Sequence, residues 1–404
     1  MSRRDVVVVG AGPGGAAAAH YLACRGADVL LVDRAHFPRD KACGDGLTPR
    51  AVAVLADMGL LPTLQAAGRQ IEEVEIVAPG GGATRSAIPS GGGAPGHALV
   101  VPRLLLDETL RARAVASGAA WRGGLEVLGV APDGDGVVVA GRDRDGAVSF
   151  GARIAVIATG ASTGLLRRIG LLERPPAMLT AARTYFDGID GLVNRLQLRF
   201  DGVQLPGYGW VFPVSPTAAN VGAGSFAASR WWRRRRTTAR SAFDAFTGTP
   251  AMRALLAGAH MTAPVRGYPL RVDFATARTV GERVLLVGEA AGLVNPLTGE
   301  GIDYALESGR LAGEHLADLL AAGDLSARAL ARYDAELRAR FQSLFVFCHS
   351  VRRWLVHRVP LDALVGTARR RAAVRAALVE IVLGQRAVTG RGSLGRAARL
   401  LLAP

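Results

Sequence analysis

A glycine-rich loop near the N-terminus constrains the fold of this chain more than any other feature. Residues 6–9 are four valines, which predict a buried parallel strand, and residues 10–15 follow with the spacing G-x-G-x-x-G before an alanine-rich helix. Such a loop holds the pyrophosphate of a dinucleotide at a helix N-terminus, although glycine-rich turns also occur in α/β proteins without a cofactor. A second predicted strand over 27–32 leads into Asp33, whose carboxylate can bind a ribose hydroxyl. The residues expected at the nucleotide are Gly10, Gly12, Pro13, Gly14, Gly15, Asp33 and Arg34.

Length and composition indicate a globular protein from a reducing compartment. With 404 residues, half of them apolar, the chain is long enough for two or three structural units around large cores. No segment has the roughly 20 uninterrupted apolar residues that span a bilayer, and the N-terminus leads into a strand rather than a signal peptide. Three cysteines are too few for a disulfide framework. We therefore expect a cytoplasmic protein.

The chain is strongly basic, and almost all of its positive charge is arginine. The formal net charge is +15, and Lys41 is the only lysine. Such an excess favours anionic partners, namely lipid head groups, a diphosphate or nucleic acid. Because no nucleic-acid-binding motif accompanies it, we expect no nucleic-acid partner. The tryptophan- and arginine-rich segments 230–236 and 352–354 predict either solvated helix faces or a peripheral contact with the anionic inner face of a membrane.

The strand and helix patterns alternate between two kinds of unit along the chain. They predict an α/β fold, in which a Rossmann-type nucleotide-binding domain is interleaved with an antiparallel-sheet substrate domain and followed by helices. In the nucleotide-binding domain, a three-stranded meander near 124–150 is expected to precede a separate buried strand, 152–157. A helix is expected over 229–247. The expected domains are 1–60, 97–175 and 271–324 (nucleotide binding), 61–96 and 176–270 (substrate binding), and 325–404 (C-terminal helical region).

A second nucleotide motif lies far from the first, in residues 284–302, VLLVGEAAGLVNPLTGEGI. It resembles the second flavin motif of the FAD-dependent reductases and hydroxylases related to p-hydroxybenzoate hydroxylase. The resemblance implies a glutathione reductase-like FAD-binding fold in which an acid after the strand binds the ribityl chain. That acid is usually Asp and is Glu289 here, and the following helix N-terminus would face the isoalloxazine and the pyrophosphate. The FAD-binding residues implied by this motif are Glu289, Pro296, Gly299, Gly301 and Ile302.

Two further segments narrow the resemblance. Residues 37–50, which contain the sequence CGDG, and residues 205–213, which contain YGWVFP, are similar to motifs of the geranylgeranyl reductase family. With residues 295–304, they most resemble the actinobacterial members that reduce an isoprene unit of menaquinone, and the likeness covers about residues 4–320. It implies an FAD-dependent reductase that saturates C=C bonds of a prenyl chain. The further FAD contacts that it implies are Cys43, Gly44, Arg103, and Thr159 with Gly160, where relatives commonly have Asp-Gly.

Saturation of an isolated double bond needs a hydride and a proton. Reduced flavin supplies the hydride, so an acid must lie across the double bond from it. The expected catalytic residues are Cys43, Asp45 and Tyr208, and a partly buried packing thiol is the alternative for Cys43. Asp107, one helical turn after Arg103, forms with it an ordinary i,i+4 helix pair in the simplest interpretation.

Tyr208, Trp210 and Phe212 alternate along one predicted strand, so their side chains face the same way. Facing a core, they would be ordinary packing residues. Facing the cofactor, they would form the wall of an apolar pocket for a prenyl chain, and we therefore expect them to bind the substrate. Pro206 and Pro213 flank this strand and predict that it lies at a sheet edge or pocket mouth.

Other functions share the same scaffold. An aromatic hydroxylase or other monooxygenase stays open, as does a flavin- or lipid-binding carrier without catalysis, for which Thr159 and Glu289 are weak hints. A halogenase is disfavoured, because its relay lysine would have to be Lys41 in the CGDG loop. With no second nucleotide motif for a donor, NAD(P)H and ferredoxin both stay open as the external electron donor. His349 and His357 are isolated, so no metal site is expected.

Overall fold

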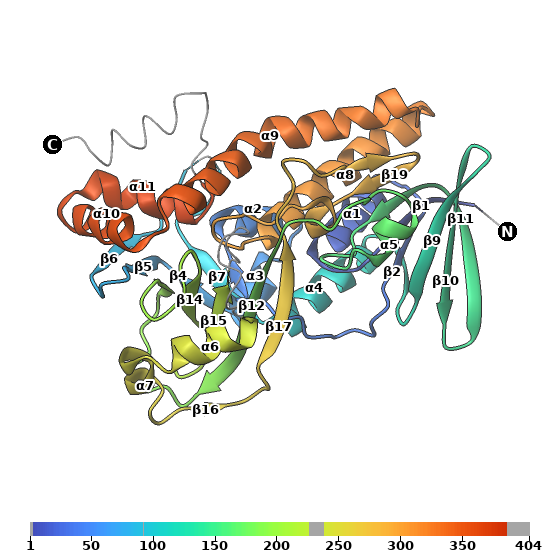
Figure 1. Ribbon diagram of the computed structural model, residues 1–404. Coiled ribbons are helices and arrows are strands. Elements are labelled where there is room, and N and C mark those ends of the chain that lie inside the picture. The colour runs from blue at the N-terminus through green and yellow to red at the C-terminus, as the bar shows by residue number, and fades with distance from the viewer. Residues whose placement is uncertain (1–2, 92, 226–237, 386–404) are drawn as a thin grey trace.

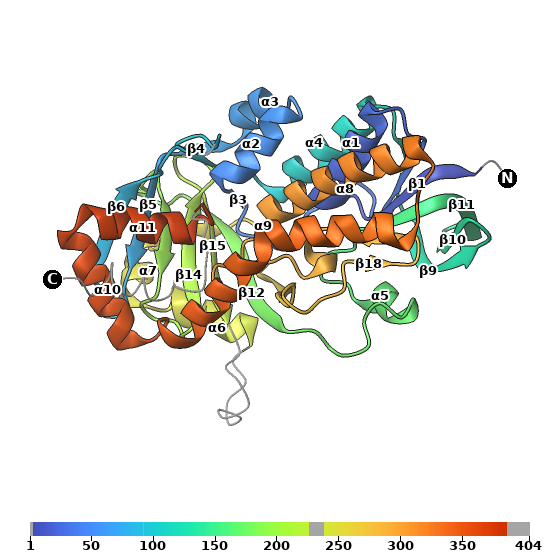
Figure 2. The same ribbon diagram turned by 90° about the horizontal axis from the view of Figure 1, so that it is seen from above.

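The computed structural model describes residues 3–91, 93–225 and 238–385, which fold around two large sheets. The first sheet lies at the end of the molecule that holds the N-terminus, and the second lies at the opposite end (Figures 1 and 2). The long helix α9 (Ala327–Trp354) runs along one side from the first sheet toward the second. Within the described residues, no helix is both long and apolar enough to cross a bilayer.

The first sheet is built on the buried valines of the N-terminal strand. β1 (Arg4–Val9) pairs in parallel with β2 (Val29–Val32) and β11 (Gly146–Ile157), in the order β18-β19-β11-β1-β2-β8. Because β1 is central, residues 6–9 are at most 5% exposed. This parallel sheet with its covering helices confirms the predicted α/β class. Its other strands are β8 (Ala120–Arg122), β9 (Glu126–Asp133), β10 (Gly136–Asp143), β18 (Val280–Gly281) and β19 (Val284–Leu286).

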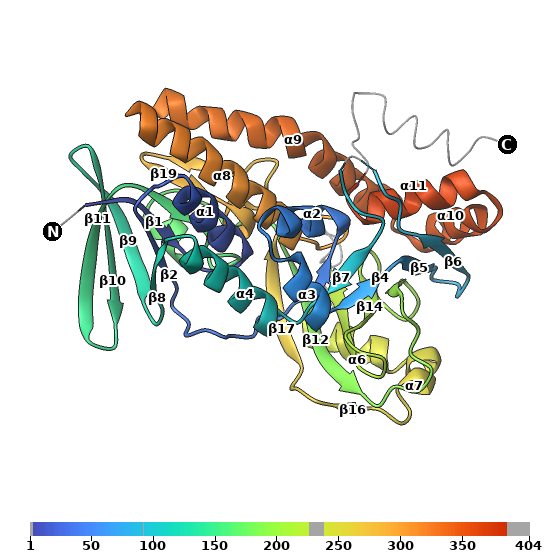
Figure 3. The same cartoon turned by 180° about the vertical axis from the view of Figure 1, so that it is seen from behind.

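Helices α1 (Pro13–Cys24) and α8 (Ile302–Ala322) pack unusually closely on this sheet (Figure 3). A Cβ atom at Gly309 would lie 2.3 Å from the carbonyl oxygen of Gly14, so only glycine permits this approach. The two glycine-rich loops, at residues 10–15 and 295–301, which are far apart in sequence, therefore meet at neighbouring helix N-termini. The remaining helices of this part are α4 (Arg103–Ala116), α5 (Gly164–Arg168) and the 3₁₀ turn η1 (Gly288–Ala291).

The expected meander is present, but its third strand does not end before the parallel sheet. β11 is one continuous strand, which pairs with β10 in antiparallel fashion through Ala152 and with β1 in parallel from Ala152 onward. The prediction of a separate strand over 152–157 was therefore wrong. The change of partner occurs at Ala152 with no turn, and Gly151 just before it stays paired within the strand, so this glycine does not mark a strand end.

The second sheet has the order β16-β12-β15-β14-β13-β5-β6, with β17 also paired to β12. Its strands pair antiparallel except for β13 with β5, which are parallel. The segments near 70–90 and 176–270, in which strands were expected, thus contribute to one sheet. The strands are β5 (Glu73–Val77), β6 (Ala83–Ala87), β12 (Met178–Asp187), β13 (Leu196–Arg199), β14 (Tyr208–Pro213), β15 (Ala219–Ser225), β16 (His260–Met261) and β17 (Arg266–Arg271).

Strand β14 is interior, which corrects the expectation of a sheet edge. It pairs with β13 on one side and β15 on the other. Pro206 lies before the strand and Pro213 is its last residue, so neither removes an N–H group from the middle of the ladder. Of the helix expected over 229–247, residues 229–237 lie outside the described residues; the described part forms a helix from Ala239, where Thr238 has extended backbone and forms a capping box with Ser241. Helices α6 (Ala239–Thr247) and α7 (Pro250–Leu255) cover this sheet.

The C-terminal helices do not form a separate body. α10 (Arg358–Arg370) and α11 (Ala372–Val382) lie on the far side of the second sheet, against β6 (Figure 1). Leu383 and Val379 join the same core cluster as Ile76 and Leu198. A small third sheet and two helices complete the fold, namely β3 (Gly46–Leu47), β4 (Arg69–Ile71), β7 (Ala98–Val100), α2 (Pro49–Asp57) and α3 (Leu61–Ala67). The domain boundaries stated above stay a prediction.

Candidate functional site

A cavity of about 720 Å³ begins at the first glycine-rich loop and reaches residues of α11. One end is polar and is lined by glycines, Asp33 and Arg34, whereas the other is lined by aromatic and aliphatic side chains. Most of the predicted site residues lie in the wall of this cavity. The predicted residues that line it are Gly10, Gly12, Pro13, Gly14, Asp33, Arg34, Cys43, Gly44, Asp45, Arg103, Thr159, Gly160, Tyr208, Trp210, Phe212, Glu289, Gly299, Gly301 and Ile302.

The first glycine-rich loop has the geometry of a phosphate cradle. Gly10 has φ +106°, and a Cβ atom there would lie 2.4 Å from the carbonyl oxygen of Ala158. Gly15 does not line the cavity, and its role is packing, since a Cβ atom would lie 1.8 Å from the carbonyl oxygen of Gly10. Asp33 accepts a hydrogen bond from the N–H of Ala11 over 2.8 Å, which ties the end of β2 to the loop.

Glu289 lies where the second motif meets the CGDG segment. Its Oε1 accepts a hydrogen bond from the N–H of Arg271 over 3.1 Å, and its Oε2 pairs with Lys41 Nζ at 3.2 Å. Gly160, with φ +63°, is so near that a Cβ atom would lie 3.4 Å from the same Oε2. Lys41 and the backbone of Arg271 therefore position the longer acid of this chain. The hydroxyl of Thr159 donates to the carbonyl of Ser162 in the adjoining turn.

The loop before α8 is held by its own backbone. Gly299, with φ +72°, donates its N–H to the carbonyl oxygen of Asn295 over 2.9 Å. Gly299, Gly301 and Ile302 line the cavity, so free helix N–H groups are available there. Pro296 does not line it; its carbonyl oxygen instead accepts a hydrogen bond from Arg352 over 3.0 Å.

Arg103 and Asp107 form a buried ion pair rather than a surface helix pair. Two nitrogens of Arg103 each donate to Asp107 over 2.7 Å, and Arg39 NH1 lies 2.8 Å from the same carboxylate. Asp107 has no exposed surface. Arg39 also reaches the phosphate cradle, because its NH2 would lie 3.6 Å from a Cβ atom at Gly12. The carboxylate thus holds two cations on the cavity wall.

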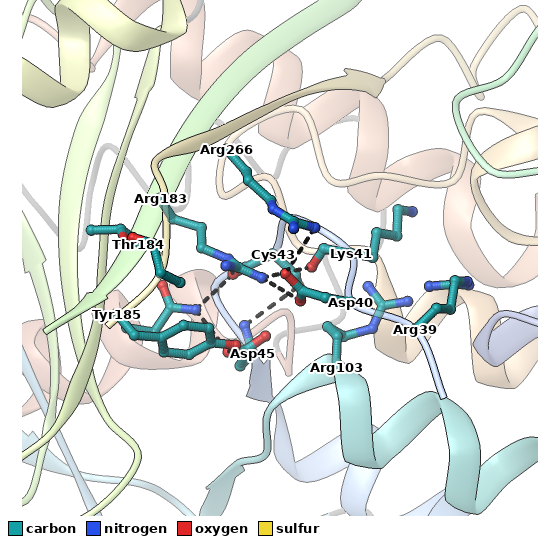
Figure 4. Close-up of polar contacts among 12 residues, drawn as sticks. Arg39, Asp40, Lys41, Cys43, Asp45, Arg103, Arg183, Thr184, Tyr185 and Arg266 are labelled. Carbon is teal, nitrogen blue, oxygen red and sulfur yellow. Dashed lines mark hydrogen bonds and ion pairs between the residues drawn. The ribbon is translucent and has the colours of Figure 1, made fainter. Parts of the chain in front are cut away.

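The CGDG loop is held by a buried polar network from the second sheet (Figure 4). The carbonyl oxygen of Cys43 accepts hydrogen bonds from Arg183 over 3.2 Å and from Asn220 over 2.7 Å. Asp45 has φ +64°, and its Oδ2 accepts from Tyr185 over 2.6 Å and from Asn220 over 2.7 Å. Burial raises the pKa of Asp45 to about 6, although these hydrogen bonds favour its ionised form.

Strand β14, which carries Tyr208, Trp210 and Phe212 and is called the aromatic strand below, directs these side chains toward the cavity and the CGDG loop. A Cβ atom at Gly44 would lie 3.2 Å from the ring of Phe212 and 3.4 Å from Nε1 of Trp210. The indole of Trp210 donates to Asn220 over 2.9 Å, and the hydroxyl of Tyr208 donates to the carbonyl of Thr298 in the second flavin loop. Burial raises the pKa of Tyr208 above its ordinary value. The strand therefore connects the two loops that border the cavity.

Several wall residues were missed by the sequence reasoning. Arg39 lies within a quoted motif, and the alternation of Arg183 and Tyr185 along β12 could have indicated a shared face. Nothing in the sequence relates Val382 and Leu383, which line the apolar end, to the loops near residue 10. Within the described ranges, no three His, Cys, Asp or Glu side chains are placed to bind a metal ion together.

Comparisons with known proteins agree with this geometry. The FAD binding domain family matches residues 3–186. The menaquinone reductase of Mycobacterium tuberculosis strain H37Rv is 38% identical over 336 residues, covering 77% of this chain and 76% of its own. Digeranylgeranylglycerophospholipid reductase 1 of Methanopyrus kandleri is 33% identical, covering 87% of this chain and 90% of its own.

Solved structures share the fold at lower identity. A geranylgeranyl bacteriochlorophyll reductase-like protein from Thermoplasma acidophilum superposes with a TM-score of 0.82 at 23% identity, over 94% of this chain and 96% of its own. The flavin-dependent brominase Bmp2 superposes with a TM-score of 0.80 at 18% identity, over 99% of this chain and 98% of its own. At these identities the likeness shows the fold alone.

The residues present fit FAD. Gly10, Gly12 and Gly14 line the cradle with backbone alone, and buried polar atoms of the wall lack protein partners, namely Arg183 NH1 and Asp45 Oδ1. The first loop and Asp33 suit the adenosine and pyrophosphate, and Glu289 with the α8 N-terminus suits the ribityl and flavin end. The chain belongs to the geranylgeranyl reductase family of FAD-dependent oxidoreductases.

Proposed function

We propose that this protein saturates C=C bonds in the prenyl chain of a lipid, such as a menaquinone or a geranylgeranyl lipid. The observation that carries the proposal is the apolar end of the cavity, which continues directly from the flavin loops. Tyr208, Trp210 and Phe212 form one wall, and Leu198 and Leu383 lie farther along. A chain of isoprene units offers only apolar surface, which this lining matches. The names of the relatives, menaquinone reductase and digeranylgeranylglycerophospholipid reductase, support the same class, since both lipids contain prenyl chains.

The chain's own residues would bind the cofactor, orient the alkene and exclude water. FAD, when bound and reduced, supplies a hydride. N–H groups at the α8 N-terminus, near Gly301 and Ile302, would stabilise negative charge on the reduced flavin. The cations Arg39 and Arg103 would face the anionic parts of the cofactor. The faces of the aromatic strand would stabilise positive charge that develops on the alkene.

The surroundings of the three proposed catalytic residues affect how readily each of them could donate a proton. The hydroxyl of Tyr208 already donates to a carbonyl, and burial raises its pKa, so it is a weak acid. Asp45 is a stronger acid, but two donors hold it in its ionised form. Cys43 lines the cavity between them, and its Sγ accepts from the N–H of Asp45 over 3.4 Å.

The test uses the holoenzyme reduced by dithionite, which needs no knowledge of the natural electron donor. Menaquinone and a geranylgeranyl lipid are incubated with it anaerobically, and the extracts are analysed by mass spectrometry. We expect products heavier by two hydrogen atoms for each reduced bond. Purified protein without bound FAD, or unchanged lipid masses with both substrates, would refute the proposal.

Monooxygenation is the alternative function on the same scaffold. The single lysine that a halogenase would need is paired with Glu289 and lies 4.6 Å from the ring centre of Tyr268. This pairing supports reduction over halogenation. Oxygen consumption coupled to NAD(P)H oxidation, with incorporation of oxygen into an aromatic substrate, would favour the hydroxylase instead; anaerobic turnover would exclude it.

We further propose that the protein contacts an anionic membrane surface through the corner between α9 and α10. Trp354 is 66% exposed and Val359 is 77% exposed, and Arg353 stacks on the indole of Trp354 at 5.0 Å. An exposed aromatic ring among arginines suits the lipid interface. The segment Arg230–Arg236, including Trp231 and Trp232, lies outside the described residues.

Sedimentation with vesicles of anionic phospholipid tests the membrane proposal. The double variant Trp354→Glu with Val359→Glu should lose binding, whereas Met261→Glu, at another exposed apolar site, should not. Equal binding of wild type and double variant would contradict the proposed corner. Vesicles of neutral lipid serve as the control for charge.

A further inference from the structure

Glu300 is an acid in the second flavin loop that the mechanism above does not use. It lies between Gly299 and Gly301, and it lines the cavity. The hydroxyl of Thr298 lies 3.5 Å from its Oε2, and Thr298 is also the residue whose carbonyl accepts from Tyr208. The carboxyl group therefore lies beside the aromatic strand, on the loop that borders the flavin end of the cavity.

The polar groups near Glu300 contact the neighbouring acid Asp303 more closely than they contact Glu300 itself. Asp303, one helical turn away, accepts from the N–H of Tyr304 over 2.8 Å and from Thr48 over 3.4 Å. Arg50 lies 3.9 Å from Asp303 and pairs with Glu307. Arg50 and the Thr298 hydroxyl also favour the ionised form of Glu300, but burial and the negative charge of Asp303 outweigh them. The other titratable groups that face Glu300 are Tyr208 on β14, Tyr304 on α8 and Cys348 on α9.

The two acids consequently differ in protonation. Burial raises the pKa of Asp303 to about 6, opposed by Arg50, so this acid is ionised at neutral pH. Burial, and then the charge of Asp303, raise the pKa of Glu300 well above its ordinary value. A pair of neighbouring acids with separated pKa values is the pattern expected for one proton donor beside one fixed charge. Asp45, by contrast, has two donors to its ionised form.

We propose that Glu300 is the acid that protonates the alkene, an assignment that rests on the proposed function. The π bond of the alkene breaks and two C–H bonds form. The proton of Glu300 goes to the less substituted carbon, and the hydride, with its electron pair, goes from reduced FAD to the tertiary carbon. The flavin is left oxidised, and the Glu300 carboxylate takes a proton from water. The carboxylate of Asp303 and the ring of Tyr208 face the positive charge that develops.

The test compares Glu300→Gln with Glu300→Asp and with Glu307→Gln, which alters the same polar cluster outside the cavity lining. Each holoenzyme is checked for FAD content and for flavin reduction by dithionite, and single-turnover reduction of the lipid is then measured from acid to alkaline pH. We expect Glu300→Gln to reduce the rate by about 100-fold or more, as for loss of a general acid. Glu300→Asp should recover part of the rate, and Glu307→Gln should stay close to wild type.

Two further measurements separate the acid from a structural role. The wild-type rate should fall at alkaline pH as Glu300 loses its proton, and this decline should be absent in Glu300→Gln. The infrared spectrum of the wild type at neutral pH should contain a protonated-carboxyl C=O band that Glu300→Gln lacks. The band is read without substrate, so it does not depend on the proposed function.

The possible results are distinguishable. A Glu300→Gln rate within about twofold of wild type, or no carboxyl band assigned to Glu300, overturns the assignment while the reductase function stands. A large loss in Asp45→Asn with none in Glu300→Gln would assign the proton to Asp45 instead. If the wild type reduces no prenyl lipid although the band is present, the proposed function fails, and the assignment fails with it.

Discussion

Replacement of Asp107 by alanine should destabilise the protein far more than its helix spacing suggests. An exposed i,i+4 ion pair contributes about 0.3–0.5 kcal/mol to the free energy of unfolding. Asp107 is fully buried, and it accepts two hydrogen bonds of 2.7 Å from Arg103 while Arg39 lies 2.8 Å away. Its removal would leave the buried guanidinium of Arg103 without its counter-ion, for which a loss of about 3–5 kcal/mol is expected.

Glu108, the next residue, is the matched control. It pairs with Arg111 on the outer part of the same helix, and 32% of its side chain is exposed. Glu108→Ala should therefore change the free energy of unfolding by less than about 1 kcal/mol. Both substitutions shorten an acid to alanine in one helix, so the net charge changes alike, and the difference in helix propensity between Asp and Glu is only a few tenths of a kcal/mol.

Urea unfolding of the holoenzyme at two FAD concentrations measures the effect. Because ligand binding adds to stability by mass action, the dependence on FAD separates weakened cofactor binding from weakened folding. We expect Asp107→Ala to lose stability at both concentrations and also to bind FAD more weakly, since Arg39 and Arg103 line the cavity. Equal losses for Asp107→Ala and Glu108→Ala would refute the reasoning from burial.

Three further predictions follow from the wall of the cavity. Gly10→Ala should abolish FAD retention, because its Cβ atom would lie 2.4 Å from a carbonyl oxygen at φ +106°, whereas Gly129→Ala, with nothing within 4 Å, should retain FAD; the ratio of flavin to protein absorbance is the measurement. Asp45→Asn should flatten the pH dependence of stability. The folded-state pKa of about 6 exceeds the reference 3.8, so the folded state holds this proton more tightly and wild-type stability falls as pH rises through that window, by on the order of 3 kcal/mol. Equal slopes in urea titrations of wild type and Asp45→Asn from about pH 4 to pH 7 would contradict the buried acid. Leu383→Trp should shorten the apolar end and shift the products toward fewer reduced bonds in mass spectra, while the exposed Val359→Trp should leave the product distribution unchanged.

The nucleotide end of the site could be predicted from the sequence because its constraints are local. The spacing of Gly10 and Gly15 follows from a tight turn and a close helix, and both constraints operate within a few residues. The same holds for the alternation of Tyr208, Trp210 and Phe212 along one strand, which placed all three on the cavity wall. The alternation of side chains along a strand and the spacing of glycines in a turn therefore indicate this local geometry directly.

The parts that could not be predicted depend on long-range contacts. Strand β14 is interior because β13 and β15 pair with it on its two sides, and the prolines that flank it do not indicate this pairing. Burial of Asp107 follows from Arg39, which arrives from a loop far away in sequence. The raised pKa of Glu300 follows first from burial and then from the charge of Asp303, and it is opposed by Arg50 on another helix. Arg39 and Arg50 are each far in sequence from the acid that they affect, so no short window of the sequence contains these pairs.

The place of Leu383 in the cavity wall has a consequence for biosynthesis. The cavity is lined by Gly10 at one end and by Leu383 at the other, so its wall is complete only when almost all of the described chain has been synthesised. The first sheet likewise needs β19, near residue 285, beside β11. Contacts of such sequence separation form late and slowly in folding. A nascent chain would therefore expose its apolar pocket until the last helices arrive, and FAD would be captured after synthesis rather than during it.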